Sequence, residues 1–387
     1  MFRIVWCLGG IFFAGTALAD VDLRIHYLRK DVEAPPTLSN LDSPPDNLGL
    51  AGARVGLADN QTTGSFLGQR YELTYTAIAP DDDLREAANA ALADTQLLVI
   101  DAPPDDLLAV ADLDKAAGAV IFNVAAPEAR LRSEDCRGNI LHTLPSNAMR
   151  TDALAQFLVR KRWDDLALVA GVHPADVAFA DTLRNSTAKF GLDIDTEKTW
   201  AFDADMRRNA AQEVPLFTQD LGDYDALLIA DETGDFGRYV LYNTWQARPV
   251  TGSEGLTAVT WAPVVEQWGA AQLQSRFADF AGRGMQSKDY AAWAAIRSIG
   301  EAVTRTKSAD AATLREYLIS DEFELAGFKG RPMNYRSWNG QLRQPIPIVH
   351  PRALVAMAPL EGFLHQRTEL DTLGLDQPES KCQAFTE

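Results

Sequence analysis

Short apolar runs alternate with segments of helical periodicity along most of the chain. The apolar runs predict strands at Leu23–Leu28, Tyr71–Ile78, Gln96–Asp101, Ala119–Val124, Asp165–Ala170, Asp225–Ala230 and Arg248–Ser253. The segments between them predict helices at Leu48–Gln61, Asp82–Ala93, Pro104–Lys115, Ala148–Lys161, Pro174–Phe190, Met206–Leu221 and Phe236–Trp245. This alternation, in one series before about residue 142 and another after it, predicts an α/β fold of two doubly wound parallel-sheet lobes.

The last third of the chain departs from this alternation. Its pattern predicts helices at Pro263–Phe280, Asp289–Thr306 and Ala312–Ile319, and then extended segments at Met333–Tyr335 and Pro345–Val349. A return to helix and then to strand indicates that the chain passes between the lobes more than once. We expect a three-crossing hinge, with crossings near His142–Ser146, Val259–Pro263 and Gly330–Arg336. The resulting division is an N-terminal lobe (20–142 plus 260–330), a C-terminal lobe (143–259 plus 331–360) and a tail (361–387).

The first nineteen residues are typical of a secretory signal peptide. Arg3 precedes an apolar run from Ile4 to Phe13, and Ala17-Leu18-Ala19 provides small residues for cleavage. The apolar run is shorter than the ~20 residues that a membrane anchor needs. We therefore expect export to the periplasm and exclude residues 1–19 from the fold.

The charge of the chain limits its partners. Removing residues 1–19 takes away one base and no acid, so that 35 basic residues face 54 acidic ones, a formal net charge of −19. A surface of this sign repels nucleic acid and anionic lipid. We expect a monomer that does not bind nucleic acid.

Two cysteines remain after the expected cleavage, Cys136 and Cys382. They could be two free buried thiols, or one disulfide that ties the tail to the first half of the chain. Export to an oxidising compartment favours the disulfide.

Catalytic and metal-binding motifs are scarce. Ser186 and Lys189 match S-x-x-K, and His173 stands three residues before Asp176, but patterns this short arise by chance in long chains. Asp193, Asp195 and Glu197 alternate like calcium ligands, yet they lack the glycine and the closing glutamate of a calcium loop, so a solvated strand edge is the better interpretation. No glycine-rich phosphate loop follows the first strand. We expect no catalytic residue, no metal and no required cofactor.

The ends of the predicted strands offer a binding site instead. Ligands of open parallel sheets lie beyond the carboxyl ends of the strands, and between two such lobes those ends face each other. The residues expected there are Arg29, Lys30, Pro103, Ala126, His173, Asp231 and Glu232. We therefore predict that a small molecule binds in the cleft between the lobes.

Aromatic and arginine residues gather between positions 236 and 268. Aromatic faces stack on a flat ring and arginine forks bind carboxylates, so the mixture is typical of sites for flat anions. Most of these aromatic residues are expected to pack in the core. Arg248 and Trp261, close to a predicted strand end and a predicted crossing, are the expected ligand contacts.

Several stretches resemble the type I periplasmic substrate-binding proteins of ABC transporters, the branched-chain amino-acid-binding class. They are Cys136–Ser146, Lys161–Ala170, His173–Gly191, Tyr290–Val303 and Phe328–Gly340. The resemblance covers nearly the whole mature chain and rests on the order of individually loose motifs. It implies a solute-binding protein, not an enzyme, that delivers its ligand to ABC permease subunits.

Other stretches are similar to a subfamily associated with pyrroloquinoline quinone (PQQ)-dependent alcohol dehydrogenase systems. They are Pro249–Trp261, Glu266–Arg276, Gly340–Pro345, Glu361–Gln366 and Asp371–Gly374. This similarity implies a ligand linked to alcohol oxidation, either PQQ itself or an alcohol-derived compound. It leaves open an alternative role, a periplasmic receptor or cofactor-delivery module that docks on a PQQ-dependent dehydrogenase or a sensor.

The chain differs from the amino-acid binders at the loops that hold their ligand. The Ser/Thr-rich loops of that class are replaced here by Asp101-Ala-Pro-Pro104 and Asn123-Val-Ala-Ala-Pro127. This replacement places an amino-acid ligand in doubt. Asp231 and Glu232 keep an acidic pair where that class often binds an ammonium group, and this pair argues against a pocket for a purely anionic ligand.

Overall fold

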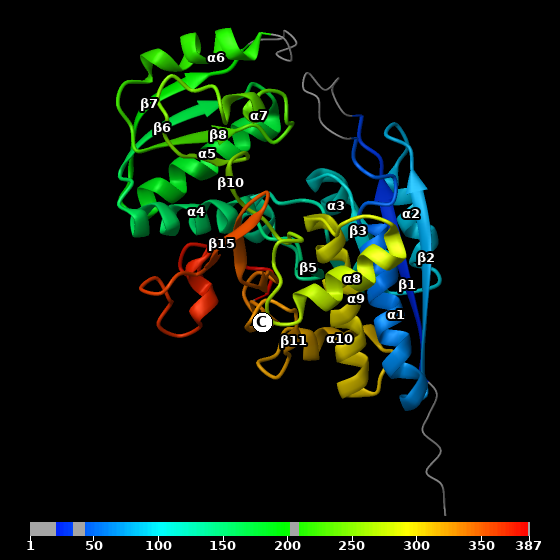
Figure 1. Ribbon diagram of the computed structural model, residues 1–387. Helices are drawn as coiled ribbons and strands as arrows, with labels where there is room; N and C mark the ends of the chain where they lie inside the picture. Colours follow the sequence, from blue (N-terminus) through cyan, green and yellow to red (C-terminus); the bar gives the residue numbers. More distant parts are fainter. Residues whose placement is uncertain (1–20, 34–42, 202–208, 386–387) are drawn as a thin grey trace, which may run out of the picture.

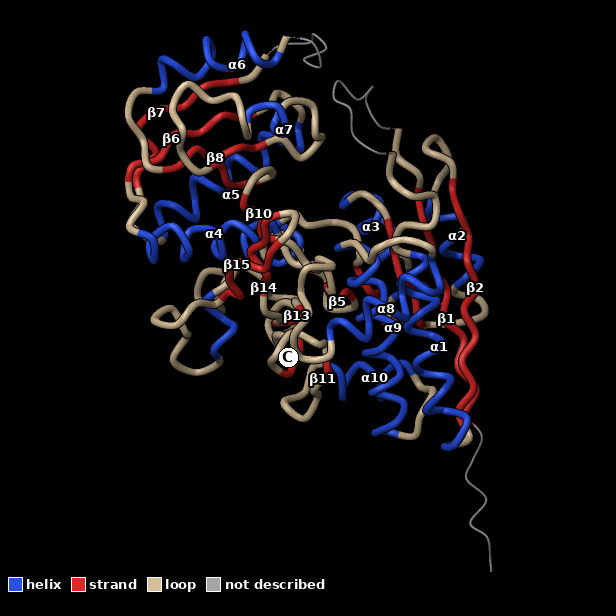
Figure 2. The backbone as a smooth tube through the Cα atoms, in the orientation of Figure 1, coloured by secondary structure: helices blue, strands red, loops and turns tan. Residues whose placement is uncertain are grey.

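The computed structural model describes residues 21–33, 43–201 and 209–385. The predicted signal peptide and the predicted helix start at Met206 lie outside these residues. Figure 1 shows two lobes side by side, each a sheet covered by helices, and Figure 2 shows the strands enclosed between helices. The predicted α/β fold of two lobes is confirmed.

The first lobe contains a parallel five-stranded sheet. Its strands are β1 (Val21–Lys30), β2 (Gln69–Ile78), β3 (Leu97–Asp101), β4 (Val120–Asn123) and β5 (Ile140–His142), in the order β2-β1-β3-β4-β5. Side chains alternate between the two faces, so that Val99 belongs to one apolar core and Ile100 to the other.

Helices cover both faces of this sheet. One face packs on α1 (Leu50–Leu67), α8 (Ala270–Ala281), α9 (Ser287–Thr306) and α10 (Ala311–Leu318). The other packs on α2 (Leu84–Ala91) and α3 (Pro104–Ala111).

The second lobe contains a mixed seven-stranded sheet in the order β15-β14-β10-β9-β8-β6-β7. The strands β6 (Asp165–Ala170), β7 (Asp193–Thr199), β8 (Ala226–Ala230), β9 (Val250–Gly252) and β10 (Leu256–Ala258) pair in parallel, and β14 (Ile346–His350) and β15 (Ala353–Ala358) are antiparallel. On one face lie α4 (Asn147–Lys161) and α5 (Pro174–Lys189), and on the other α6 (Ala210–Thr218) and α7 (Gly237–Val240).

One predicted helix is much shorter than expected. The segment Phe236–Trp245 forms only the single turn α7. Phe236 and Val240 are buried, whereas Tyr242 and Trp245 are 79% and 62% exposed, so the apolar face that would hold a longer helix is missing.

The chain passes between the lobes where buried side chains change from one core to the other. The changes fall between Leu141 and Met149, between Ala258 and Trp261, and between Leu342 and Ile346. The third crossing, between Leu342 and Ile346, lies later in the chain than the predicted crossing at Gly330–Arg336. The reason is that Met333 and Tyr335 still pack in the core of the first lobe. They belong to a small sheet of β11 (Leu325–Ala326), β12 (Pro332–Tyr335) and β13 (Leu342–Arg343).

Cys136 and Cys382 form a disulfide, with their Cα atoms 5.6 Å apart. No helix among the described residues is both long and apolar enough to cross a membrane.

Candidate functional site: the cleft between the lobes

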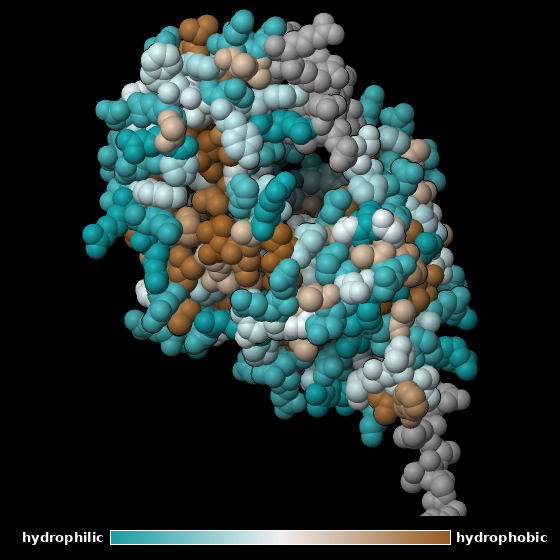
Figure 3. Space-filling view, viewed as in Figure 1, coloured by the Kyte–Doolittle hydropathy of each residue, from teal (hydrophilic) through white to brown (hydrophobic). Residues whose placement is uncertain are grey.

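The carboxyl ends of the parallel strands of both sheets lie at the same hollow. β1 and β3 of the first lobe and β6 and β8 of the second lobe run toward the space between the lobes (Figure 1). The space-filling view shows the surface hollowed there (Figure 3). Loops that follow these strands form the rim of the cleft, where parallel sheets commonly bind ligands.

On the first lobe, the rim is built around Asp101 at the end of β3. Its carboxylate accepts hydrogen bonds from the ammonium of Lys288 at 2.8 Å and from the hydroxyl of Tyr27 at 3.1 Å. Burial and the neighbouring Asp101 raise the pKa of Tyr27 well above its ordinary value, so this hydroxyl remains a donor. Lys288, in the first turn of α9, is 34% exposed.

Asp289 joins the starts of two helices beside this group. It is fully buried and accepts hydrogen bonds from the backbone N–H groups of Gly49 and Gln286, both within 3.0 Å. The guanidinium of Arg283 binds both of its oxygens, at 2.7 and 2.9 Å. Since Gly49 caps α1 and Gln286 caps α9, this carboxylate holds the two helices in register below the rim.

The residues predicted on the first lobe separate into two groups. Arg29 pairs with Asp31 at 3.0 Å, Lys30 pairs with Asp106 at 2.8 Å, and Pro103 precedes α3, so these three lie at the carboxyl edge. Ala126 is instead only 2% exposed, and its backbone N–H and C=O both bond the side chain of Asn123. Ala126 thus belongs to the support of the loop.

On the second lobe, two buried carboxylates hold the loop that follows β8. Asp231 accepts hydrogen bonds from the backbone N–H groups of Asp235, Phe236 and Gly237 at 2.6–2.9 Å. Asp176 accepts from the N–H groups of Glu232 and Thr233 at 2.6 and 3.3 Å. Burial, and secondly the negative charge of Asp231, raise the pKa of Asp176. Asp231 therefore lies at the predicted position, but its carboxylate is occupied by the backbone of its own loop.

Glu232 is paired with Arg150, which sequence reasoning missed. The guanidinium binds both carboxylate oxygens at 2.7 and 3.1 Å, and Ser253 donates a further hydrogen bond at 2.9 Å. Burial alone would raise the pKa of Glu232, but Arg150 and the hydrogen bonds outweigh it and lower the pKa. One signal in the sequence could have indicated the role of Arg150. A cation in the first turn of a helix interacts unfavourably with the helix dipole, so a nearby anion is expected to stabilise it.

His173 completes the rim of the second lobe. It precedes α5, and its Nε2 lies 3.0 Å from a carboxylate oxygen of Asp235. Its side chain is 33% exposed, so the ring remains accessible at the edge of the cleft.

The structure does not bring Arg248 and Trp261 to the cleft. Arg248 is exposed and precedes β9, so it lies at the amino end of that strand, whereas the rim is built at the carboxyl ends. Trp261 is 3% exposed and stacks on Tyr290 with ring centroids 4.8 Å apart, and its Nε1 bonds Gln274. The expected aromatic and arginine pair for a flat anion is therefore not formed by these two residues.

The short motif at Ser186 and Lys189 has a structural use. Both side chains bind the buried Asp152, at 2.5 and 3.1 Å. Among the described residues, no group of three or more His, Cys, Asp and Glu side chains could hold a metal ion.

Comparison with solved structures shows the fold. No protein-family model matches the chain, and neither does any curated protein sequence. A branched-chain amino acid ABC transporter periplasmic ligand-binding protein from Burkholderia xenovorans is 14% identical with a TM-score of 0.71, over 94% of this chain and 100% of that one. An ABC transporter substrate-binding protein from Desulfitobacterium hafniense in complex with Leu is 16% identical with a TM-score of 0.66, over 87% and 99%. A solute-binding protein of an ABC transporter from Rhodopseudomonas palustris in complex with 3,4-dihydroxybenzoic acid is 13% identical with a TM-score of 0.61, over 85% and 93%.

Proposed function

We propose that this chain is the periplasmic solute-binding component of an ABC importer, which closes on a small ligand and presents it to permease subunits. The observation that carries the proposal is the cleft itself, where the carboxyl ends of the parallel strands of both sheets face each other across a hinge. A ligand that contacts both lobes binds the closed form better than the open form, and this difference drives closure. The three solved structures of similar fold, each a binding protein of an ABC transporter, support the role.

The polar groups of the rim favour a carboxylate ligand without an ammonium group. Among the described rim residues, the carboxylates of Asp101, Asp289, Asp231 and Glu232 are each occupied by donors of the protein itself. A ligand ammonium would have to displace one of them and leave a buried donor unpaired. Lys288 and His173, each paired with a carboxylate of its own lobe, are partly exposed on opposite lobes, so an anion that bridges the lobes can share their N–H groups.

An acid derived from an alcohol fits this chemistry and agrees with the sequence similarity to PQQ-dependent alcohol dehydrogenase systems. PQQ itself, a tricarboxylate, is the second candidate ligand. Its support is that similarity alone, because Arg248 and Trp261 lie outside the cleft.

The experiment is a titration of the mature protein with PQQ, with aliphatic and aromatic carboxylic acids, and with leucine, followed by calorimetry and tryptophan fluorescence. We expect heat and a fluorescence change with a carboxylic acid, and a loss of affinity of at least tenfold in Lys288→Gln. Lys115→Gln is the matched control, because Lys115 is exposed and lies on η1 (Asp114–Ala116), outside the rim. Binding of leucine but of no simple acid would reject the proposed ligand class and keep the solute-binding role.

The similarity to the PQQ-associated subfamily also supports a second candidate role, a receptor or delivery module that docks on a dehydrogenase. A pull-down with the mature protein that captures a PQQ-dependent dehydrogenase, and not permease subunits, would favour this role over import.

A further inference from the structure

The C-terminal tail forms a fourth connection between the lobes. We call residues 370–385 the C-terminal strap. Leu373 is fully buried in the core of the second lobe, whereas Cys382 is bonded to Cys136 of the first lobe. The C-terminal end of the chain lies below the hinge in Figure 1, on the side opposite to the hollow that Figure 3 shows between the lobes.

On the second lobe, the strap is held by polar contacts to α4 and α5, of which the one between Gly374 and Asp152 is buried. The backbone N–H of Gly374 donates to Asp152 at 2.8 Å, and the ammonium of Lys189 donates to the carbonyl of Gly374 at 2.9 Å. Lys189 also bonds Glu379 at 3.1 Å. Asp152 is only 2% exposed, so loss of the Gly374 contact would remove one donor from a buried carboxylate.

Beside the hinge, the strap is held by two arginines of the small sheet. The Nε–H groups of Arg336 and Arg343 each donate to the same oxygen of Asp371 at 2.8 Å. Arg336 also donates to the backbone carbonyls of Leu373 and Leu375, at 2.7 and 2.9 Å. Arg336 is 1% exposed, so this attachment is part of the interior of the protein.

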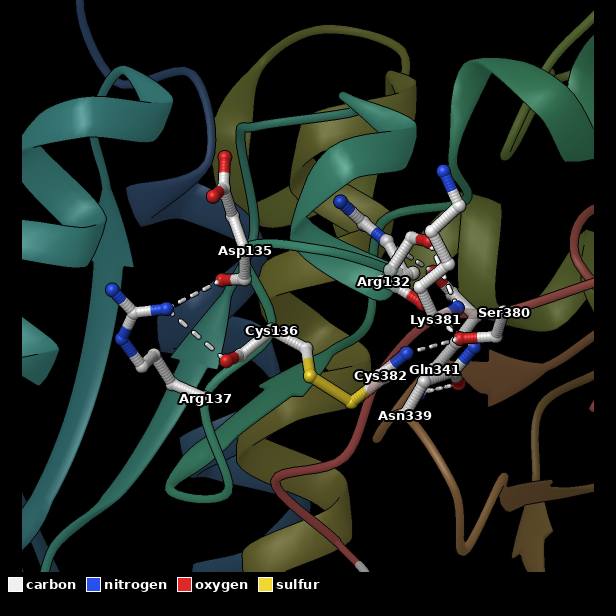
Figure 4. Close-up of a disulfide and its surroundings, with 10 residues drawn as sticks. Arg132, Asp135, Cys136, Arg137, Asn339, Gln341, Ser380, Lys381 and Cys382 are labelled. Carbon is white, nitrogen blue, oxygen red and sulfur yellow. Dashed lines mark hydrogen bonds between the residues drawn. A yellow bond between two sulfur atoms is a disulfide. The ribbon is translucent and has the colours of Figure 1, made fainter.

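On the first lobe, the attachment is covalent. Figure 4 shows the Cys136–Cys382 disulfide next to the loop that carries Arg132. Ser380 donates to the carbonyl of Arg132 at 2.7 Å, and the N–H of Lys381 donates to the hydroxyl of Ser133 at 3.0 Å. A covalent bond keeps the end of the strap near this loop even when the hydrogen bonds open.

The position of the strap gives it a mechanical effect. A rotation that brings two lobes together on one side of a hinge moves them apart on the other side. The strap spans that other side, between its attachments at Gly374 and Cys382. The segment between them is shortened by a turn, in which the N–H groups of Glu379 and Ser380 bond the carbonyl of Asp376. Closure of the cleft therefore pulls on this turn and on the contacts of Gly374 and Glu379 with the second lobe.

We infer that the disulfide-anchored strap is a latch that opposes closure of the cleft and so sets how strongly a ligand must bind both lobes to close it. The inference rests on the proposed function, because it concerns the regulation of the same cleft. If the disulfide is cut, the strap can leave the first lobe and the closed form becomes more populated.

The test measures the distance across the mouth of the cleft without any ligand. Spin labels are placed on cysteines introduced at Asp82 and Thr199, two exposed positions that follow β2 and end β7. We expect Cys136→Ser/Cys382→Ser to give a broader distance distribution that extends to shorter separations than in the oxidised wild type. Ser133→Ala is the matched control, because it removes one hydrogen bond of the strap, keeps the disulfide, and should leave the distribution unchanged.

Superimposable distributions in the wild type and a folded double-serine variant would overturn the latch. If the double variant does not fold, hydrogen exchange of the wild type tests the latch. The backbone amides of Gly374 and Lys381 should exchange slowly, and fast exchange of either amide would overturn the latch. Both measurements are independent of the ligand titration, so the latch and the solute-binding role can fail separately.

Discussion

Single buried carboxylates hold the loops of the cleft in place. Asp231, Asp176 and Asp289 each accept hydrogen bonds from backbone N–H groups of a loop or of a helix start. Without these carboxylates, the N–H groups would lack a partner. A charge-assisted hydrogen bond of this kind is stronger than a neutral one. The acidic residues that a sequence pattern offers as ligand contacts are therefore largely part of the framework of the site.

The ion pair of Arg150 and Glu232 provides a test of this view. Because the two side chains are only 19% and 21% exposed, removing one partner leaves the other poorly solvated. We expect Arg150→Gln and Glu232→Gln each to lower the free energy of unfolding by about 1–2 kcal/mol. The double variant should lose less than the sum, with a coupling energy of about 1 kcal/mol in urea unfolding. Strictly additive losses would show that the pair does not act as a unit.

His142 makes the stability of the protein depend on pH. It is 1% exposed, and burial, with Arg132 nearby, lowers its pKa well below the ordinary value of 6.5. The folded state thus keeps a neutral ring where the unfolded chain binds a proton, so stability falls as the pH drops below about 6.5, by up to about 1.4 kcal/mol per pH unit. In thermal unfolding between pH 7 and 5, His142→Asn should flatten this decline. The half-buried His26 also has a lowered pKa and should contribute a smaller part of the loss of stability, which His26→Asn should remove. Parallel curves for the wild type and His142→Asn would contradict the assignment.

At the scale of elements, α1 and α9 approach each other closely in the first lobe. Small residues make this approach possible. A Cβ atom on Gly52 would overlap the backbone of Asp289, and one on Gly300 would overlap the side chain of Asn60. The helical periodicity of both segments could be predicted from the sequence, but which glycines lie at the contact could not, since that depends on the distance between two helices.

Gly52→Ala should therefore force α1 away from α9. We expect a loss of about 1–3 kcal/mol in the free energy of unfolding, measured by urea titration. Gly118→Ala is the matched control, because a Cβ atom there meets nothing within 4 Å. It should be neutral or stabilise the chain by less than about 1 kcal/mol. Equal stability of the two variants would argue against tight packing at Gly52.

At the scale of the whole molecule, the disulfide joins positions 246 residues apart and connects the tail to the first lobe. A bond that closes so long a loop restricts the unfolded chain strongly. The lobes are thus joined by the backbone crossings at the hinge and by the strap on the side opposite to the cleft.

Loss of this bond should lower the global stability. We expect Cys136→Ser/Cys382→Ser to lower the free energy of unfolding by about 2–5 kcal/mol and to reduce Tm accordingly. The reduced wild type should unfold with the same midpoint as the double variant under the same conditions. An unchanged Tm in the variant would mean that the tail is held mainly by its hydrogen bonds.

The sequence by itself determined the class of the fold. Alternating apolar runs and helical periods record which side chains face an interior, and this record is local, so β1, β3, β4, β6 and β8 and the long helices follow from it. The two cysteines left after the expected cleavage likewise reduced the choice of pairing to one bond or none.

Only the tertiary structure decided which charges meet and which strand ends face the cleft. Lys288 reaches Asp101 across 187 residues and Arg150 reaches Glu232 across 82, and no local pattern encodes such distances. Arg248 and Trp261 were expected at the cleft for the same reason that Arg150 was missed: an aromatic or charged residue shows its chemistry in the sequence, but its neighbours depend on how the strands and the lobes pack.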